Sequence, residues 1–278
     1  MTDQYAVIGH PVEHSLSPAI HAEFARATGQ DITYGKISAP LNGFEAAARR
    51  FFQDGGKGLN VTLPFKREAW DMVNRHKGYA FDAEAVNTIK PVGAKLEGHN
   101  TDGVGLIADL EQNLGFPIKG KRVLLMGAGG ATYGVTHPVL NRQPASLIVA
   151  NRTLEKAIRL VAHFEEIQEI SVGEFAARPY DQLGGAQFDL VINATSAGLK
   201  DAMPPLPGDV FAQGALAYDM VYGKTTPFLE FAKGKGARVA DGLGMLVEQA
   251  AESFFIWREC ARPKTAPVIE MLRTRLRA

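Results

Sequence analysis

The stretch KRVLLMGAGGATYGVTHPVL, residues 121–140, joins an apolar run, a glycine-rich turn and a helical pattern. Its run VLLM is typical of a buried parallel strand, and Gly127, Gly129 and Gly130 follow where the chain must turn. Glycines in this place let backbone N–H groups approach a pyrophosphate, whose charge then faces the helix N-terminus. The stretch therefore predicts a dinucleotide-binding unit. The third glycine of the G-x-G-x-x-G pattern is absent, because Thr132 occupies its position.

Strands and helices alternate on both sides of this stretch. Strand-like runs follow it at residues 145–153, 188–198 and 215–222, which indicates a doubly wound sheet. Residues 5–63 before it have the pattern strand, helix, strand, helix, strand, which favours a mostly parallel sheet. The end of the chain, residues 242–276, contains two amphipathic helices with no strand between them.

The expected fold class is therefore α/β with two domains. We expect an N-terminal, mostly parallel α/β substrate domain of residues 1–102, completed by C-terminal helices in residues 243–278. A Rossmann-like nucleotide domain, residues 103–242, is inserted between these parts.

Composition limits the classes of partner. The 278 residues include 30 basic and 30 acidic side chains, so no net charge attracts the chain to nucleic acid or to an anionic membrane. No apolar run approaches the ~20 residues that span a bilayer. The N-terminus lacks the pattern of a signal peptide, and the single cysteine, Cys260, cannot form an internal disulfide. We expect a cytoplasmic protein with a small-molecule substrate. The sequence leaves the oligomeric state open, with a homodimer as one candidate.

The strand at residues 145–153 decides between the two dinucleotides. An NAD site places an acidic residue about 20 residues after the glycines, whereas an NADP site accommodates a 2′-phosphate there with arginine. This strand ends in Asn151, Arg152 and Thr153, and Lys156 follows one helical turn later. The cluster predicts NADP. The alternative is that Thr153 only caps a helix and Arg152 is only solvated.

Two further residues suggest proton transfer. Lys66 ends the stretch GLNVTLPFK, at the mouth of a predicted buried strand, and Asp102 lies in GHNTDG at the predicted domain junction. A lysine ammonium can donate the proton that a reduced ketone requires, and a carboxylate can orient it. Without the motifs around it, a single lysine is more often a solvated surface residue.

An ordered set of motifs resembles those of the shikimate dehydrogenase family. The set is IGHPVEHSLSPAIH, GLNVTLPFK, AVNT, NTDGVG, GAGGA, NRT, NATSAG, DMVYGKTTPFL and DGLGMLVEQAAESF, which together extend over nearly the whole chain. The resemblance implies NADP-dependent, reversible reduction of 3-dehydroshikimate to shikimate in aromatic amino-acid (chorismate) biosynthesis. It also implies two α/β domains around a cleft.

The resemblance implies roles for individual residues. The implied catalytic pair is Lys66 and Asp102. The implied substrate-binding residues are Ser15, Ser17, Asn60, Thr62, Asn87, Tyr222 and Gln249. The implied cofactor-binding residues are Gly127, Ala128, Gly129, Gly130, Ala131, Asn151, Arg152, Thr153, Lys156, Asn193, Thr195, Met220, Gly242 and Met245.

Several of these residues also have simpler interpretations. In these interpretations Ser15 and Ser17 cap a helix, and Asn87 satisfies the end of a strand, without any contact with substrate. Met220 and Met245 are then core residues. No metal site is expected, because no histidine pair has metal-ligand spacing; His10, His14 and His21 are expected to make local hydrogen bonds.

Three alternative functions are kept. A relative from the aminoshikimate pathway would look similar in sequence. A broader quinate/shikimate dehydrogenase would share the catalytic pair but accept a wider range of substrates and cofactors. A non-catalytic NADP-sensing protein is a different class, and it would be expected to lose Lys66 or Asp102.

Overall fold

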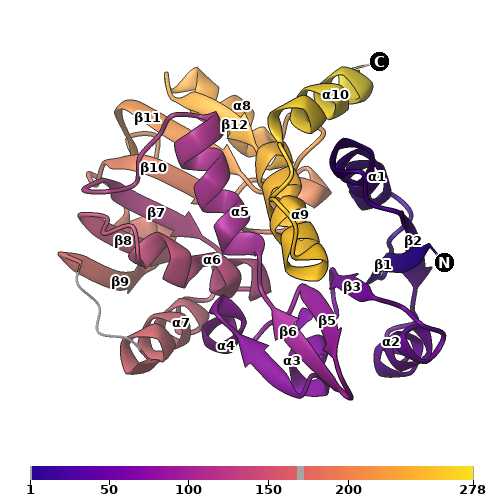
Figure 1. Ribbon diagram of the computed structural model, residues 1–278. Coiled ribbons are helices and arrows are strands. Elements are labelled where there is room, and N and C mark those ends of the chain that lie inside the picture. Colours follow the sequence, from indigo (N-terminus) through magenta and orange to yellow (C-terminus); the bar gives the residue numbers. More distant parts are fainter. Residues whose placement is uncertain (1, 168–171, 278) are drawn as a thin grey trace. The chain divides into compact units, whose positions relative to one another are not determined.

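A computed structural model describes residues 2–167 and 172–277 of the chain (Figure 1). The chain divides into two compact units, each with its own sheet. The first unit consists of Met1–Gly105 and Leu246–Arg275, and the second consists mainly of Leu106–Met245. Parallel strands with helices dominate both units, so the expected α/β class is confirmed.

The sheet of the first unit has the strand order β2-β1-β3-β5-β6-β4. Its strands are β1 (Asp3–Gly9), β2 (Ile32–Ser38), β3 (Gly58–Val61), β4 (Arg75–Lys77), β5 (Thr88–Val92) and β6 (Lys95–His99). Strand β1 pairs in parallel with β2 and β3, as the alternating pattern predicted, whereas β5 is antiparallel to both β3 and β6. The antiparallel hairpin β5–β6 turns at Gly93, whose φ of 60° suits glycine.

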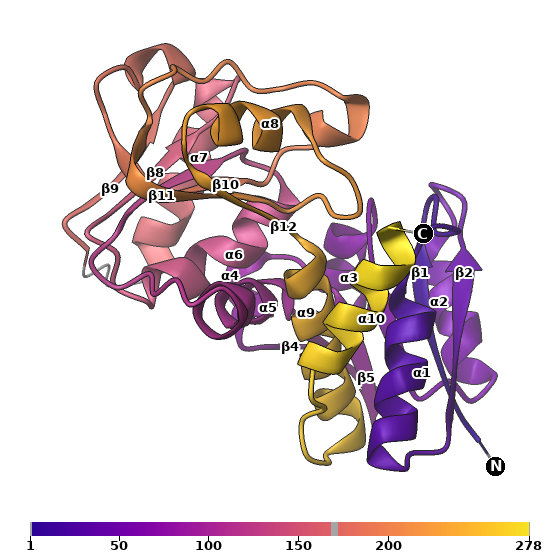
Figure 2. The same ribbon diagram turned by 90° about the horizontal axis from the view of Figure 1, so that it is seen from above.

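Helices cover both faces of this sheet. They are α1 (Ser17–Thr28), α2 (Phe44–Gln53), α3 (Lys66–Met72), α4 (Tyr79–Ala83), α9 (Leu243–Arg258) and α10 (Ala266–Arg277). Successive side chains of β1 point to opposite faces. Ala6 and Ile8 join a core cluster with Phe44 of α2, while Tyr5 contacts Trp257 of α9 on the other face. Helices α1, α9 and α10 lie together in both views (Figures 1 and 2).

The second unit contains a fully parallel sheet with the order β12-β11-β10-β7-β8-β9. Its strands are β7 (Arg122–Met126), β8 (Ser146–Ala150), β9 (Glu174–Arg178), β10 (Phe188–Asn193), β11 (Phe211–Asp219) and β12 (Arg238–Asp241). The sequence pattern did not predict β9 or β12. It also placed the end of β11 three residues too late, because the strand stops at Asp219, whose carboxylate accepts the N–H of Val221.

The central strands β7, β8 and β10 are apolar on both faces, as a doubly wound fold requires. The helical elements are α5 (Asp102–Ala108), η1 (Asp109–Asn113), α6 (Gly130–Leu140), α7 (Leu154–Ile167), η2 (Tyr180–Gln182), η3 (Ala197–Lys200) and α8 (Pro227–Gly234). Val123 and Leu125 of β7 belong to the core cluster that includes residues of α6 and α7. Leu124 and Met126 belong to the opposite cluster, which includes residues of α8.

The predicted helix at residues 103–115 is not a regular α-helix. It begins as α5 and continues as the π-helical turn η1. Asp109, the first residue of that turn, is 2% exposed, and it accepts a hydrogen bond from the Tyr218 hydroxyl at 2.7 Å. This partner is 109 residues away in sequence, so the periodicity of the helix could not reveal the irregularity.

Gly58 provides a stability test of the packing in the first unit. A Cβ atom added there would lie 2.5 Å from Nε1 of Trp257, whose N–H donates to the Ile89 carbonyl. We expect Gly58→Ala to lower the free energy of unfolding by about 1–3 kcal/mol through overpacking. Gly35→Ala is the matched control, because that strand glycine has nothing within 4 Å of an added Cβ. Urea denaturation of both variants measures the difference, and equal stability would contradict this account.

Candidate active site

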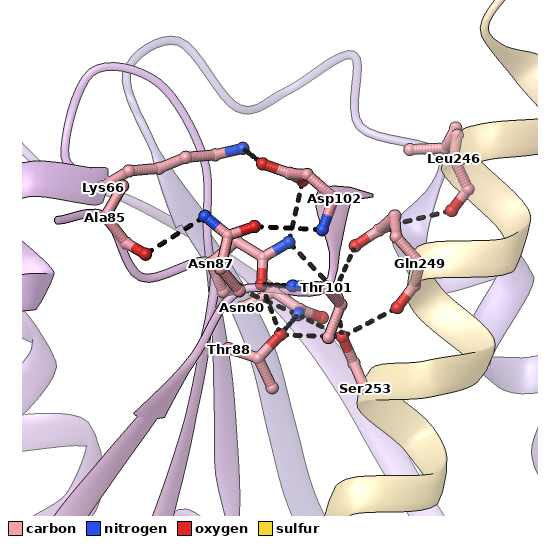
Figure 3. Close-up of polar contacts among 11 residues, drawn as sticks. Asn60, Lys66, Ala85, Asn87, Thr88, Thr101, Asp102, Leu246, Gln249 and Ser253 are labelled. Atoms are coloured by element: carbon pink, nitrogen blue, oxygen red, sulfur yellow. Dashed lines mark hydrogen bonds and ion pairs between the residues drawn. The ribbon is translucent and has the colours of Figure 1, made fainter. Parts of the chain in front are cut away.

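Lys66 and Asp102 form an ion pair in the first unit. The Lys66 Nζ atom lies 2.5 Å from Asp102 Oδ2, and the two side chains are 18% and 10% exposed (Figure 3). Lys66 is the first residue of α3 and Asp102 the first of α5. Because Cα–Cβ bonds tilt toward a helix N-terminus, both side chains extend back past the start of their helices. The structure thus brings together the two residues that the sequence selected for proton transfer.

Asn87 holds the second oxygen of the Asp102 carboxylate. Its Nδ2 donates to Asp102 Oδ1 at 2.8 Å and to Thr101 Oγ1 at 2.9 Å. Its Oδ1 accepts from the N–H of Thr101 and from Thr88 Oγ1, each at 2.9 Å. The carboxylate is therefore fixed at both oxygens, by Lys66 and by Asn87. Asn87 also satisfies strand-end groups, as the simpler interpretation of this residue predicted.

A buried hydroxyl cluster extends this network to α9 (Figure 3). Ser253 of α9 is fully buried, and its Oγ lies 2.8 Å from Thr88 Oγ1 and 3.3 Å from Thr101 Oγ1. Gln249, one helical turn earlier, accepts from Thr101 Oγ1 at 3.3 Å and donates to the Leu246 carbonyl. The sequence patterns did not single out Thr88, Thr101 or Ser253, although the motifs AVNT and NTDG already contain the two threonines.

Asn60 connects the hydroxyl cluster to the aromatic side of the unit. Its Nδ2 donates to the Asn87 carbonyl, Thr88 Oγ1 and Ser253 Oγ, each at 3.1 Å. Its Oδ1 accepts from the Tyr34 hydroxyl at 2.7 Å. The Asn87 carbonyl can only accept, so it sets which end of the Asn60 amide is the donor. Tyr34 is a further residue that the sequence did not reveal, since it lies 26 positions from Asn60.

His21 does not make the local hydrogen bonds that we expected. Its ring stacks on Tyr34 with centroids 4.2 Å apart, and neither ring nitrogen has a hydrogen-bond partner in the described part of the chain. Burial lowers the pKa of His21 to about 3, and the neighbouring Asn60 amide offsets only a small part of that effect. The prediction was wrong because the partners of His21 are aromatic rings from distant segments, including Trp257.

The two predicted serines lie together at the start of α1. The Ser15 hydroxyl donates to Ser17 Oγ at 3.1 Å and accepts from the N–H of Ser17 at 3.3 Å. Ser15 therefore makes a local turn with Ser17, whereas the N-cap residue of α1 is Leu16 and has no side-chain cap. Thr62 follows β3, and its methyl group would lie 2.4 Å from a Cβ added to Gly9, so glycine is required there.

In the second unit, the predicted cofactor residues follow strands that end in register. Met126, Ala150, Asn193 and Asp219 are the last residues of β7, β8, β10 and β11, and consecutive strands of the sheet pair at these positions. Ligands of doubly wound sheets bind beyond this carboxyl edge. The residues that come next in the chain include several of the predicted cofactor contacts, namely Gly127, Asn151, Met220 and Gly242.

The glycine turn has the geometry of an anion-binding loop. Gly127 has a φ of 111°, and an added Cβ would lie 3.3 Å from the Ala194 backbone, so glycine is required. Gly129 and Gly130 are exposed with open space around them, and no side chain caps the N-terminus of α6. The predicted contacts Ala128 and Ala131 flank these glycines. The backbone N–H groups of this turn can therefore hold a phosphate.

Thr132 explains why a third glycine is unnecessary. Its side chain is fully buried and lies beside Gly127, at 3.2 Å from the position of an added Cβ. The side chain of Thr132 therefore packs between α6 and the sheet, at the position where the standard fingerprint has a glycine.

The cluster after β8 carries exposed positive charge. Arg152, Thr153 and Lys156 are exposed, and among the described residues neither cation has an ion-pair partner. Asn151 is partly exposed, and its Nδ2 donates to the Thr153 carbonyl at 2.8 Å, which fixes the turn into α7. The cluster can accept a phosphate without first breaking an ion pair.

The remaining predicted residues lie after β10, β11 and β12. Asn193 is 1% exposed, and it accepts from the N–H and hydroxyl of Thr195 at 3.1 and 2.7 Å. A Cβ added to Gly242 would lie 2.3 Å from the Met220 carbonyl oxygen, so these two segments touch. Met245 is half-buried near the start of α9. Tyr222 is also half-buried, and burial raises the pKa of its hydroxyl.

Metal sites and membrane spans are both absent from residues 2–167 and 172–277. Within these ranges no three His, Cys, Asp or Glu side chains are grouped as a metal site would require. Within them also, no helix has the length and apolar character needed to cross a membrane.

Comparison with known families identifies three consecutive matches. Residues 7–89 match the family described as shikimate dehydrogenase substrate binding domain. Residues 109–200 match the family described as shikimate / quinate 5-dehydrogenase. Residues 242–273 match the shikimate 5'-dehydrogenase C-terminal domain.

Individual proteins are similar over nearly the full chain. A protein from Methylobacillus flagellatus named shikimate dehydrogenase (NADP(+)) is 54% identical over 272 residues, which cover 98% of this chain and 99% of that protein. The structure of an Ael1 enzyme from Pseudomonas putida is 46% identical, with a TM-score of 0.91 and 98% of each chain covered. That of shikimate 5-dehydrogenase from Thermus thermophilus in complex with NADP(H) and shikimate is 33% identical, with a TM-score of 0.86, and covers 98% of this chain and 99% of that one.

The buried His21 predicts a pH dependence of stability. The folded pKa of about 3 lies below the ordinary value of 6.5, so the unfolded chain binds more protons between these values. Stability from this group is therefore present above pH 6.5 and is lost as pH falls toward 3. Between pH 7 and pH 5 the loss should be about 2 kcal/mol. Between pH 7 and pH 5, the free energy of unfolding from urea denaturation should fall by about 2 kcal/mol less in His21→Phe than in wild type. Between pH 8 and pH 7, the change should match that of wild type. If the free energies of unfolding of wild type and His21→Phe fell equally from pH 7 to pH 5, the prediction would be contradicted.

Proposed function

This chain belongs to the shikimate dehydrogenase family, and we propose that it catalyses the NADP-dependent, reversible reduction of 3-dehydroshikimate to shikimate. In this role it serves aromatic amino-acid (chorismate) biosynthesis. The observation that carries the mechanism is the Lys66–Asp102 ion pair, since it provides an oriented proton donor. It argues equally against a non-catalytic NADP-sensing protein, which would have no need of the pair.

Lys66 is proposed to exchange the proton of the reaction. During reduction its ammonium donates a proton to the C3 oxygen of the substrate, and during oxidation the neutral amine takes that proton back. Asp102 orients the ammonium and accepts a hydrogen bond from a substrate hydroxyl. The bond from Asn87 to Asp102 Oδ1 keeps the carboxylate in this orientation while the charge of Lys66 changes.

Hydroxyl and amide side chains are proposed to bind the rest of the substrate. Ser17 and Ser15 are proposed to donate hydroxyl hydrogen bonds to the substrate carboxylate, for which the Ser15 hydroxyl must turn away from Ser17 Oγ, and Tyr222 is proposed to assist them. The proposed contacts with the ring hydroxyls are Asn60, Thr62, Asn87 and Gln249. Amides and hydroxyls suit this recognition, because a ligand that lacks one hydroxyl leaves a polar group unpaired.

The second unit is proposed to bind NADP. When bound, NADPH supplies the hydride that reduces the substrate carbonyl carbon. The turn at Gly127 and the uncapped N-terminus of α6 fit the pyrophosphate, and the exposed Arg152 and Lys156 fit the 2′-phosphate. The segments that carry Thr195 and Met220 supply the carboxyl edge beyond which the nicotinamide would bind. The remaining cofactor residues named from the resemblance stay part of this proposal.

The proposed division of labour follows the expected domains. Residues 1–102 with 243–278 bind substrate and residues 103–242 bind NADP. Because quinate is also named in a matching family, a broader quinate/shikimate dehydrogenase is the second candidate. Steady-state kcat/KM with shikimate and quinate, each with NADP and NAD, separates the two candidates. Action in the cytoplasm and assembly as a homodimer stay predictions from sequence.

The proton-transfer role predicts a defined kinetic defect. Lys66→Ala should lower kcat by ~10² to 10⁴, the usual contribution of a positioned acid or base, while NADP binding stays normal. Asp102→Asn should also slow turnover, and the double variant should lose much less than the product of the two single losses. Arg67→Ala is the control, because this neighbouring exposed cation on α3 pairs with Glu84. An unchanged kcat in Lys66→Ala at saturating shikimate and NADP would remove the catalytic assignment.

The phosphate role of Arg152 predicts a cofactor-specific defect. Losing a charge-assisted hydrogen bond costs about 1.5–3 kcal/mol, so Arg152→Ala should raise the KM for NADP roughly 10- to 100-fold and leave that for NAD unchanged. Arg159→Ala removes an exposed arginine from α7 itself and should change neither constant. The assignment fails if the unmutated protein uses NAD as efficiently as NADP.

A further inference from the structure

A buried carboxylate at the end of β11 has no place in the reaction as described. Asp219 is 0% exposed, and its strand pairs in register with Asn193 of β10 and Asp241 of β12. Burial raises the pKa of Asp219, and the nearby charge of Asp241 adds a smaller contribution in the same direction. Burying an ionised carboxylate is unfavourable unless hydrogen bonds satisfy its oxygens. The partners of Asp219 therefore indicate what the carboxylate does.

The hydrogen-bond donors to the Asp219 carboxylate come from the carboxyl edge of the sheet. Oδ1 accepts from the N–H of Val221 at 3.0 Å. Oδ2 accepts from Asn193 Nδ2 at 3.1 Å and from Thr226 Oγ1 at 2.6 Å. Asn193 in turn accepts twice from Thr195. One carboxylate therefore holds the segment that follows β10 and the segment that follows β11.

Both segments carry residues that are proposed to contact the reactants. Thr195 lies on the first, and Met220 and Tyr222 lie on the second. The second segment is also held from the neighbouring strand, because Asp241 Oδ2 accepts from the N–H of Gly223 at 3.2 Å. Asp219 is thus hydrogen-bonded to Val221, which lies between Met220 and Tyr222, and to Asn193, which holds Thr195.

We propose that Asp219 is a positioning residue, which fixes the segments after β10 and β11 so that the nicotinamide and the substrate meet in the reactive alignment. This inference rests on the proposed function and adds a residue to it. Asp219 touches neither reactant; it acts through Asn193, Thr195 and the Met220–Tyr222 segment. With Asn193 as the donor, the role requires a carboxylate at position 219, because both oxygens must accept while neither atom donates.

Asp219→Asn tests the proposal with almost no change in volume. One oxygen becomes an NH₂ group, which faces a donor whichever way the amide turns: the N–H of Val221 or the Nδ2 of Asn193. A misplacement of about 1 Å can cost ~10²-fold in rate, so kcat should fall about 10- to 100-fold. The Kd for NADP should stay within about threefold, because the phosphates bind at the loops after β7 and β8.

A reciprocal substitution provides the rescue. In Asn193→Asp alone, two carboxylates face each other without a donor, so kcat should fall as well. In the double variant Asn193→Asp/Asp219→Asn, the new amide donates to the new carboxylate, whose other oxygen still accepts from Thr195. The Thr226 hydroxyl loses its acceptor in this variant, so we expect kcat to return to within about tenfold of wild type and to exceed that of both single variants, a reversal that general loss of stability would not produce.

Asp189→Asn is the matched control. Asp189 lies near the start of β10, at the opposite edge of the sheet, and it accepts from the backbone and guanidinium of Arg122 at 2.8–3.1 Å. This variant also loses hydrogen bonds of a strand-end aspartate, yet its kcat should equal that of wild type. Melting temperatures of all variants establish that kcat is measured on folded protein.

The outcomes separate this inference from the proposed function. A wild-type kcat in Asp219→Asn, an equal loss of NADP affinity, a similar fall in Asp189→Asn, or no recovery in the double variant would each overturn the positioning role. Thr226→Val, which removes one donor and keeps the carboxylate, should lower kcat about three- to tenfold, and it decides the matter if Asp219→Asn does not fold. No activity in the unmutated protein would overturn both the function and the inference.

Discussion

Parallel register is the constraint on which the candidate site residues of each unit depend. Strands that pair in parallel and in register end at one edge of a sheet, so the residues that follow them gather there regardless of their separation in sequence. In the second unit this places the turns after Met126, Asn193 and Asp219 side by side. In the first unit, β1 and β3 pair through Ile8 and Val61, so Gly9 and Thr62 are the next residues of neighbouring strands.

The sequence suggested those candidate site residues whose signal is local. Gly127 and Arg152 were identified from spacing after a strand, and the α/β class from alternating apolar runs. The assignment of Lys66 relied on motifs around it, because a lone lysine has no local signature. The residues that were missed act through distant partners: Tyr34 is 26 positions from Asn60, and Ser253 is 165 positions from Thr88. A single sequence contains no periodicity at such separations.

Buried polar side chains support the candidate site residues through hydrogen bonds. Each buried donor or acceptor must be satisfied, and an unsatisfied one costs about 1–3 kcal/mol. The amide of Asn87 therefore uses Thr101, Thr88 and Asp102 together, and that of Asn193 uses Thr195 and Asp219. Such networks allow one arrangement of their members, because any rotated amide would oppose donor to donor. The buried hydrogen bonds of Asn87 and Asn193 therefore fix the orientation of the more exposed groups that they contact.

Lys66 contributes little to the stability of the fold, which agrees with its proposed role in proton transfer. A cation in the first turn of a helix opposes the helix dipole at a cost of about 0.3–1 kcal/mol, whereas Asp102 in the first turn of α5 is favoured there. Partial burial of the pair removes water from both charges, so the ion pair gives little net stabilisation. Asp102 would keep its bond from Asn87 without the lysine. A neutral side chain would therefore suit the start of α3 better, so stability does not account for the ammonium, which agrees with its proposed role as an oriented proton donor.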